Sequence, residues 1–208
     1  MRFAILLYPG VEPIDLATYG VLSMARRIEP SIQCWTVATD AGPIELASGL
    51  SVIAAHGYDD CPAFDVLIVP GGPGWVETAQ DATTLEFLRR AKSDALVCSV
   101  CTGAMILAET GLLDGLSATT KTEVVAPEES PLLVLARRHP AVKTVAASYV
   151  DNGRIVTGGG VSLCIDTTLH LLERCYNSAL AHEVARIIEY SRAWNANQQE
   201  LPAVVCVK

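Results

Sequence analysis

The chain has 208 residues, half of them hydrophobic and only 18% charged, which suits one substantial core and is too short for two ordinary domains. Its 15 basic and 23 acidic residues give a formal net charge of -8, which argues against nucleic acid and anionic membranes as partners. The seven scattered cysteines favour a reducing compartment over a disulfide framework, and we expect a cytoplasmic protein.

Short β-branched runs alternate with longer amphipathic stretches, which is typical of a parallel sheet covered by helices. The run 1–8 leads directly into Pro9-Gly10 without a cleavage site, so it predicts a first strand and not a signal peptide. No apolar stretch approaches the roughly 18 consecutive residues that a membrane helix needs.

The predicted elements follow in chain order. We expect a strand at 3–8, a helix at 13–27, a strand at 32–38, an edge hairpin of 44–47 with 50–55, and a strand at 64–69. A helix at 83–92, a strand at 95–100, a helix at 102–113, a loop around 126–131, a hairpin of 142–150 with 154–157, and helices at 162–176 and 178–190 complete the list. Residues 1–190 therefore form one predicted domain, and 191–208 form a tail of unknown role that docks on the domain or on a partner subunit.

Cys101 is the strongest candidate for chemistry. A short apolar run ends at this cysteine, and a helical pattern begins at Thr102. This arrangement predicts a nucleophile on a strand-to-helix elbow, where the helix N-terminus favours a thiolate. We therefore expect the thiol to titrate well below a free cysteine.

Two other segments are predicted to reach the same edge of the sheet. Asp15 follows the first strand, and the turn Gly71-Gly72 follows the strand at 64–69. Ligands bind beyond the carboxyl ends of strands in an open parallel sheet. These residues predict covalent catalysis by Cys101, with Asp15 transferring protons after burial has raised its pKa, and with the N–H groups of Gly72 and Thr102 stabilising negative charge.

Each residue also has a purely structural interpretation. The cysteine suits a small core residue, the aspartate a helix cap, and Gly71-Gly72 a plain turn. The triplet 158–160, with Gly159 at its centre, either lines the pocket by close backbone approach or is a flexible turn. The coincidence of three features at one edge favours the functional interpretation of Cys101.

Other cysteine and histidine chemistries are weaker. Cys98 and Cys101 form a C-x-x-C, but Cys98 falls inside the apolar strand, whereas a redox pair lies at a helix start. The remaining cysteines and the four histidines show no paired ligand spacing, so no metal is predicted. None of these histidines is adjacent to Cys101 in the sequence, which makes activation by a helix dipole and a carboxylate simpler than a Cys-His triad.

These motifs together resemble the DJ-1/PfpI superfamily, which is class I glutamine amidotransferase-like. The matching segments, in family order, are 8–16, 69–74, 99–104, 111–115, 118–120 and 157–160. The resemblance implies an α/β, flavodoxin-like fold, a mostly parallel sheet with helices on both faces, and a homodimer. It covers residues 1–190.

Asp15 and Thr102 resemble the isocyanide hydratase branch and the similar sensory domains of AraC-type regulators. That branch implies a lyase without a cofactor, in which Cys101 attacks the terminal carbon of an isocyanide, Asp15 transfers protons and water releases an N-substituted formamide. Gly71, Gly72, Thr102 and Gly159 are the implied oxyanion or substrate contacts, and the partner is a small-molecule electrophile.

Departures from the branch leave alternatives open. Lys121-Thr122 replaces the usual His-Trp of the branch. Thr102 stands where peptidase-like and amidotransferase-like members carry a histidine, which argues against proteolysis and glutamine hydrolysis. We expect no helix-turn-helix domain in a chain of this length. A glyoxalase-like or deglycase-like enzyme, and a non-enzymatic ligand or oxidative-stress sensor in which Cys101 oxidises, are the competing hypotheses.

Overall fold

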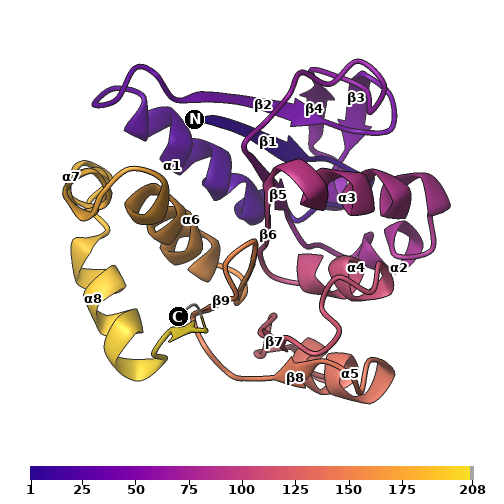
Figure 1. The fold of residues 1–208 in the computed structure, drawn as a ribbon. Helices are drawn as coiled ribbons and strands as arrows, with labels where there is room; N and C mark the ends of the chain where they lie inside the picture. The colour runs from indigo at the N-terminus through magenta and orange to yellow at the C-terminus, as the bar shows by residue number, and fades with distance from the viewer. Residues whose placement is uncertain (207–208) are drawn as a thin grey trace.

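The computed structural model describes residues 1–206, with the side chains of all of them except residues 92–94. Its centre is a seven-stranded sheet with the order β11-β9-β10-β6-β5-β1-β2 (Figure 1). The strands are β1 (Arg2–Leu6), β2 (Gln33–Val37), β5 (Val66–Val69), β6 (Leu96–Ser99), β9 (Tyr149–Asp151), β10 (Ile155–Gly158) and β11 (Val204–Val205). Neighbours pair in parallel except β9 with β10, which confirms the predicted mostly parallel sheet.

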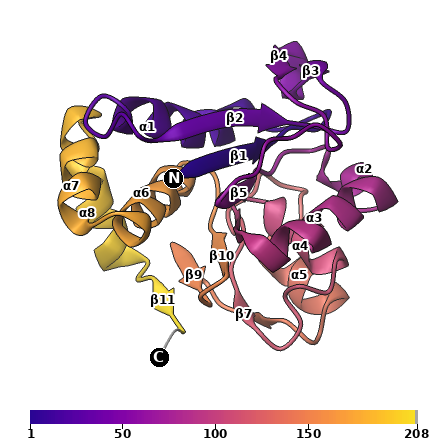
Figure 2. The same cartoon turned by 45° about the horizontal axis from the view of Figure 1, so that its top comes forward.

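Helices cover both faces of this sheet (Figures 1 and 2). One face carries α1 (Ala17–Ala25), α6 (Leu163–Cys175), α7 (Ser178–Ile187) and α8 (Ser191–Glu200), and the other carries α2 (Trp75–Thr78), α3 (Ala82–Asp94), α4 (Gly103–Glu109) and α5 (Pro131–Arg138). Strand β1 shows how the sequence divides these layers. Ala4 and Leu6 pack on the side of α4, while Phe3 and Ile5 pack on the side of α1 and α6, because successive side chains in a strand point to opposite faces.

Two small sheets lie beside the main one. Strands β3 (Gly42–Glu45) and β4 (Ser51–Ala54) pair antiparallel around the short 3-10 helix η2 (Ala47–Gly49), which confirms the predicted hairpin. Strands β7 (Ser117–Ala118) and β8 (Lys143–Thr144) pair in parallel. The single strand predicted at 142–150 is therefore wrong, because its two halves join different sheets as β8 and β9.

The first predicted helix is also divided. It begins as the 3-10 helix η1 (Pro13–Leu16) and continues as α1. Pro13 lies at the first position of η1, where the missing N–H costs nothing.

The segment after residue 190 has a defined structure. Trp194 of α8 is buried in the core on the α6 face, and Asn197 donates a hydrogen bond to Asp166 of α6 at 3.1 Å. Val204 and Val205 pair with β9 as the edge strand of the sheet. The sequence predicts the helix at 178–190 as the last one, but α8 follows α7, so that prediction is wrong. Residues 207–208 of the predicted tail lie outside the described residues.

The topology places the carboxyl ends of four strands at the same edge of the sheet. Strands β10, β6, β5 and β1 are adjacent and parallel, so the segments that follow them lie side by side at one edge. These segments contain Gly159, Cys101, Gly71-Gly72 and Asp15. The predicted convergence of the candidate residues is therefore present in the fold.

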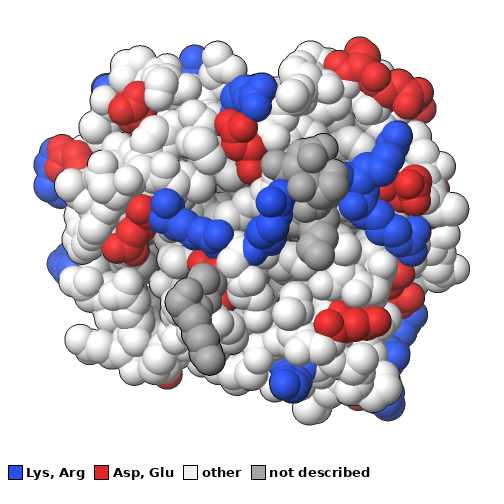
Figure 3. Space-filling view, in the orientation of Figure 1, with Lys and Arg blue, Asp and Glu red and all other residues white. Residues whose placement is uncertain are grey.

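Acidic and basic side chains are interspersed on the face shown in Figure 3. Among the described residues, no helix is both long enough and apolar enough to cross a membrane.

Candidate active site

Cys101 occupies the turn between β6 and α4 in a strained conformation. Its φ of 52° lies in the left-handed region, which residues with a side chain rarely adopt. Two hydrogen bonds hold the turn: the Cys101 N–H donates to the Gly159 carbonyl at 3.0 Å, and the Thr120 hydroxyl donates to the Cys101 carbonyl at 2.7 Å. The surroundings thus fix a backbone conformation that directs the thiol away from the sheet, as in a nucleophile elbow.

Asp15 lies in η1 and is completely buried. Its Oδ2 accepts a hydrogen bond from the Gly71 N–H at 2.7 Å, so its carboxyl group bonds the turn after β5 and does not cap its own helix. Its Oδ1 has no hydrogen-bond partner within residues 1–206 as described. A buried carboxylate oxygen without a partner is costly, which makes Asp15 a candidate for proton transfer rather than for structure.

The glycine turn and Thr102 complete the polar surroundings of Cys101. The Gly72 N–H donates to the Thr102 hydroxyl at 2.9 Å. A Cβ atom at Gly71 would come within 2.9 Å of the Cys101 Cβ and even closer to the Thr102 backbone, so only glycine fits there. The turn therefore brings the backbone of Gly71 against the elbow and orients both Asp15 and Thr102.

Burial sets the pKa values of the acid pair. Desolvation raises the pKa of Asp15 to about 7, against smaller lowering effects from the Gly71 N–H and the Cys101 side chain. Desolvation also raises the pKa of Cys101 to about 12, and the Asp15 charge adds to that rise. Near neutral pH the thiol thus keeps its proton, while Asp15 is divided between its two protonation states.

The expectation of a low Cys101 pKa is therefore wrong. The N–H and hydroxyl groups of Thr102 lower this pKa, as expected at a helix start, but burial outweighs them. Helix α4 has only seven residues, and Cys101 is 3% exposed. A reaction that used this thiol as a nucleophile would therefore need a base to take its proton, and the Asp15 carboxyl group lies next to it.

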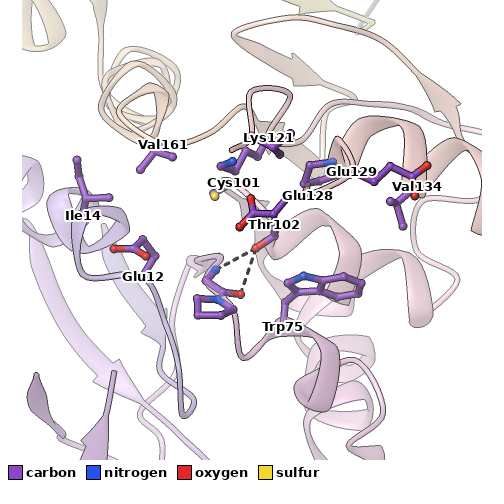
Figure 4. Close-up of a pocket in the computed structure, with 14 residues that line it drawn as sticks. Glu12, Ile14, Trp75, Cys101, Thr102, Lys121, Glu128, Glu129, Val134 and Val161 are labelled. Atoms are coloured by element: carbon purple, nitrogen blue, oxygen red, sulfur yellow. Dashed lines mark hydrogen bonds between the residues drawn. The ribbon is translucent and has the colours of Figure 1, made fainter. Parts of the chain in front are cut away.

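A pocket of about 640 Å³ opens at Cys101 and Thr102 (Figure 4). This volume lies in the range of small-molecule sites. Its apolar lining includes Ile14, Trp75, Val124, Pro131, Val134 and Val161, and its charged lining consists of Glu12, Lys121, Glu128 and Glu129. The site accordingly suits a small organic molecule with an apolar body.

The predicted contact residues differ in their access to this pocket. Gly72 and Thr102 line it, together with Cys101. Gly71 and Gly159 are not among the described residues that line it: Gly71 bonds Asp15, and Gly159 accepts the Cys101 N–H. In this structure their contacts hold Asp15 and the backbone of Cys101, and their direct substrate contacts stay a prediction.

Sequence reasoning gave no role to three pocket residues, Glu12, Trp75 and Lys121. Lys121 had attracted notice only as a departure from the related branch. Its side chain lies next to Cys101 in the pocket (Figure 4), and its charge lowers the pKa of the thiol. Trp75 is an apolar residue at the start of α2, directly after the glycine turn, and that turn was the only nearby signal for a site.

The described histidines are engaged away from the pocket. His170 Nε2 lies 2.8 Å from Asp151, and His182 Nδ1 lies 2.8 Å from the Ser178 carbonyl. None of the described residues that line the pocket is a histidine. The simpler scheme of a thiol with a carboxylate thus agrees with the geometry better than a Cys-His triad.

The two cysteines of the C-x-x-C lie in different places, as the sequence predicts: Cys98 lies in a strand and Cys101 in the turn after it. Cys98 is buried in β6, and both Cys98 and Cys101 are free. Desolvation raises the pKa of Cys98 well above its ordinary value, so this thiol behaves as a core residue. Within the described part of the chain, no group of three or more His, Cys, Asp and Glu residues is placed to hold a metal ion.

Comparison with known proteins gives consistent matches. The model of the DJ-1/PfpI family matches residues 1–174. The isonitrile hydratase of Pseudomonas putida is 32% identical over 200 residues, which cover 93% of this chain and 80% of that protein.

Two further likenesses concern a regulator and a solved structure. The HTH-type transcriptional regulator GbdR of Pseudomonas aeruginosa is 26% identical over 216 residues, covering 92% of this chain and 56% of the regulator, so the chain spans about half of its length. The crystal structure of a THiJ/PfpI family protein from Pseudomonas syringae superposes with a TM-score of 0.78 at 24% identity, covering 97% of this chain and 87% of that one. These matches confirm the predicted α/β, flavodoxin-like fold class.

Proposed function

Because this chain belongs to the DJ-1/PfpI family, we propose that it is a cysteine-dependent hydratase that converts an isocyanide into an N-substituted formamide. The observation that carries this proposal is the buried pair of Asp15, with a pKa of about 7, and Cys101 at an apolar pocket. The similarity to the P. putida isonitrile hydratase supports the choice of substrate.

The first step forms a bond between sulfur and carbon. The Asp15 carboxylate takes the Cys101 thiol proton as the sulfur adds to the terminal carbon of the isocyanide. The electron pair remains on that carbon, which receives the proton back from Asp15. The product is a thioformimidate, with an N=CH–S linkage to Cys101, and Asp15 is again a carboxylate.

Water completes the reaction. Asp15 takes a proton from a water molecule as its oxygen adds to the imidate carbon, and the nitrogen receives that proton. The carbon–sulfur bond then breaks, the hydroxyl group becomes the formyl carbonyl, and its proton returns to the sulfur. One isocyanide and one water give one formamide, and the thiol is restored.

The surrounding residues support both steps. The N–H and hydroxyl groups of Thr102 lower the pKa of Cys101 and so favour the anionic form of the sulfur as the leaving group. Apolar residues such as Trp75 and Val161 line the pocket and suit the apolar substituent of an isocyanide. Apart from the water that is consumed, the steps as written use only side chains of this chain.

A substrate comparison tests this function. We expect the wild type to convert a simple aryl or alkyl isocyanide into its formamide, and to leave a small 2-oxoaldehyde unchanged under the same conditions. Cys101→Ala should reduce isocyanide conversion to the background rate. Turnover of the 2-oxoaldehyde alone would assign the glyoxalase-like alternative instead.

The similarity to GbdR favours a sensor as the second candidate function. In that case the pocket at Cys101 would bind a ligand without converting it. Saturable binding of a small molecule by both the wild type and Cys101→Ala, without product from either, would support the sensor. The raised pKa of Cys101 makes oxidant sensing the less favourable form of that function, since the thiolate is the form that oxidises.

A further inference from the structure

The pocket cation next to Cys101 has no part in the steps above. Among the described residues that line the pocket, Lys121 is the one Lys or Arg, against three glutamates. Both Glu129 oxygens bond the Arg137 guanidinium, so its charge is paired outside the pocket. Glu129 is therefore not the ion-pair partner of Lys121, which lies next to Cys101 in the pocket.

Several contacts fix Lys121 beside the sulfur. A Cβ atom at Gly160 would lie 2.7 Å from the Lys121 Cβ and 3.1 Å from the Cys101 Sγ, so the lysine stem and the sulfur flank the same glycine. The preceding residue, Thr120, bonds the Cys101 carbonyl. On the other side, the Leu132 N–H donates to the Lys121 carbonyl at 3.2 Å. The backbone of Lys121 is thus attached both to the elbow and to α5.

The Lys121 ammonium group itself is also held. It donates a hydrogen bond to the Glu123 carbonyl, a neutral acceptor that leaves the positive charge uncompensated. The side chain is half-buried, which reduces the screening of that charge by water.

We propose that Lys121 is a positioning residue whose ammonium charge stabilises the Cys101 sulfur as an anion during addition and release of the substrate. This role rests on the proposed nucleophilic function of Cys101. In a pocket that disfavours charge, a fixed cation is a physical substitute for the imidazolium ion that activates thiols at other cysteine sites.

The ionisable groups around the sulfur make this cation necessary. Asp15 on η1 raises the pKa of Cys101, and Lys121 lowers it. The Cys101 charge raises the pKa of Tyr8, which follows β1, and of Cys164 on α6. Glu12 and Glu128 add two further acidic groups to the lining of the pocket. Lys121 is the single cation among these described groups, so its loss leaves the thiolate with acidic neighbours alone.

The test measures alkylation of Cys101 by iodoacetamide, followed at the Cys101 peptide by mass spectrometry because the chain has seven cysteines. At a fixed pH between 7 and 9, we expect Lys121→Met to slow alkylation about tenfold for each unit by which the thiol pKa rises, and Lys121→Arg to retain most of the rate. Lys143→Met, at an exposed lysine of β8, is the matched control and should alkylate at the wild-type rate.

The direction of the change separates an electrostatic role from a structural one. Loosening of the pocket would expose the buried thiol and accelerate alkylation in Lys121→Met, whereas loss of the cation slows it. Equal rates in the wild type and Lys121→Met, or acceleration in the variant, would overturn the proposal. Alkylation needs no isocyanide, so this result is independent of whether the hydratase function is correct.

Discussion

At the scale of residues, the burial of Cys101 and Asp15 raises the pKa of both side chains. The helix start after Cys101 is visible in the sequence, whereas the depth of burial and the Asp15 charge appear only in three dimensions. Because burial disfavours the thiolate, the proposed mechanism depends on a base, and proton transfer is the role that the sequence predicts for Asp15.

Replacing Asp15 by Asn separates proton transfer from thiol reactivity. We expect turnover of an isocyanide to fall about a hundredfold or more, since a positioned base is lost. Iodoacetamide should meanwhile alkylate Cys101 faster than in the wild type, because the Asp15 charge no longer raises the thiol pKa. Both rates can be measured on the same preparations, and a parallel fall in both would contradict the assignment of Asp15 as the base.

The pH dependence of turnover follows from the pKa of Asp15, which is about 7. As a base, Asp15 acts in its ionised form, so kcat/KM should rise with pH through this value. A profile of kcat/KM between pH 5 and 9 checks the expectation. A rate that is flat across pH 7, or that falls there, would be incompatible with Asp15 as the base in the free enzyme.

The same group makes stability depend on pH. Its folded pKa of about 7 lies above the ordinary value of 3.8, so its stabilising contribution is present below the lower value and is lost as the pH rises through the higher one. Asp15→Asn should therefore raise Tm relative to the wild type more at pH 8 than at pH 4. Thermal unfolding at the two pH values measures the difference, and equal shifts would show that the Asp15 pKa is not raised.

At the scale of elements, the sequence predicted most strands and helices of the main sheet but missed α5 and joined β8 to β9. Helix α5 carries ordinary helix signals, with Pro131 at its start and Arg137-Arg138 in its last turn. Pro131 was assigned to the predicted loop around 126–131, and no helix was predicted directly after it. The run 142–150 looked like one strand because β-branched residues continue through it. Its two halves pair with different partners, which no local pattern contains.

The turn after β5 provides a test of close packing at the site. Gly71→Ala places a methyl group against Thr102 and Cys101, so we expect loss of isocyanide turnover and a lower free energy of unfolding. Gly20→Ala in α1 is the matched control, because a Cβ atom there meets nothing within 4 Å. It should raise stability by about 0.5–1 kcal/mol and leave turnover unchanged. Full turnover in Gly71→Ala would contradict the close approach of this turn to the elbow.

At the scale of the whole molecule, strand order creates the site. The sequence predicts that the segments with Asp15, Gly71 and Cys101 reach one edge of the sheet, and the strands before them, β1, β5 and β6, are adjacent. The sequence does not show that Gly159, which follows β10, accepts a hydrogen bond from Cys101, because its glycine triplet is equally compatible with a plain turn. The expected homodimer stays a prediction.

The last segment of the chain tests the extent of the folded unit. Trp194 of α8 is 3% exposed, so Trp194→Ala should lower the free energy of unfolding by about 3 kcal/mol or more through loss of buried apolar contacts. Leu133→Ala on α5, where the side chain is 61% exposed, should change it by less than about 0.5 kcal/mol. Denaturant unfolding compares the two variants. A neutral Trp194→Ala would show that α8 is not part of the stable core.

The central claim is tested most directly by the steady-state rate of formamide formation from a simple isocyanide, compared among the wild type, Cys101→Ser and Asp15→Asn. The proposed mechanism predicts conversion by the wild type and near-background rates in both variants, with the folded state of each confirmed by its unfolding transition. Formamide formation that persists in Cys101→Ser, or its absence in the wild type, would contradict the mechanism.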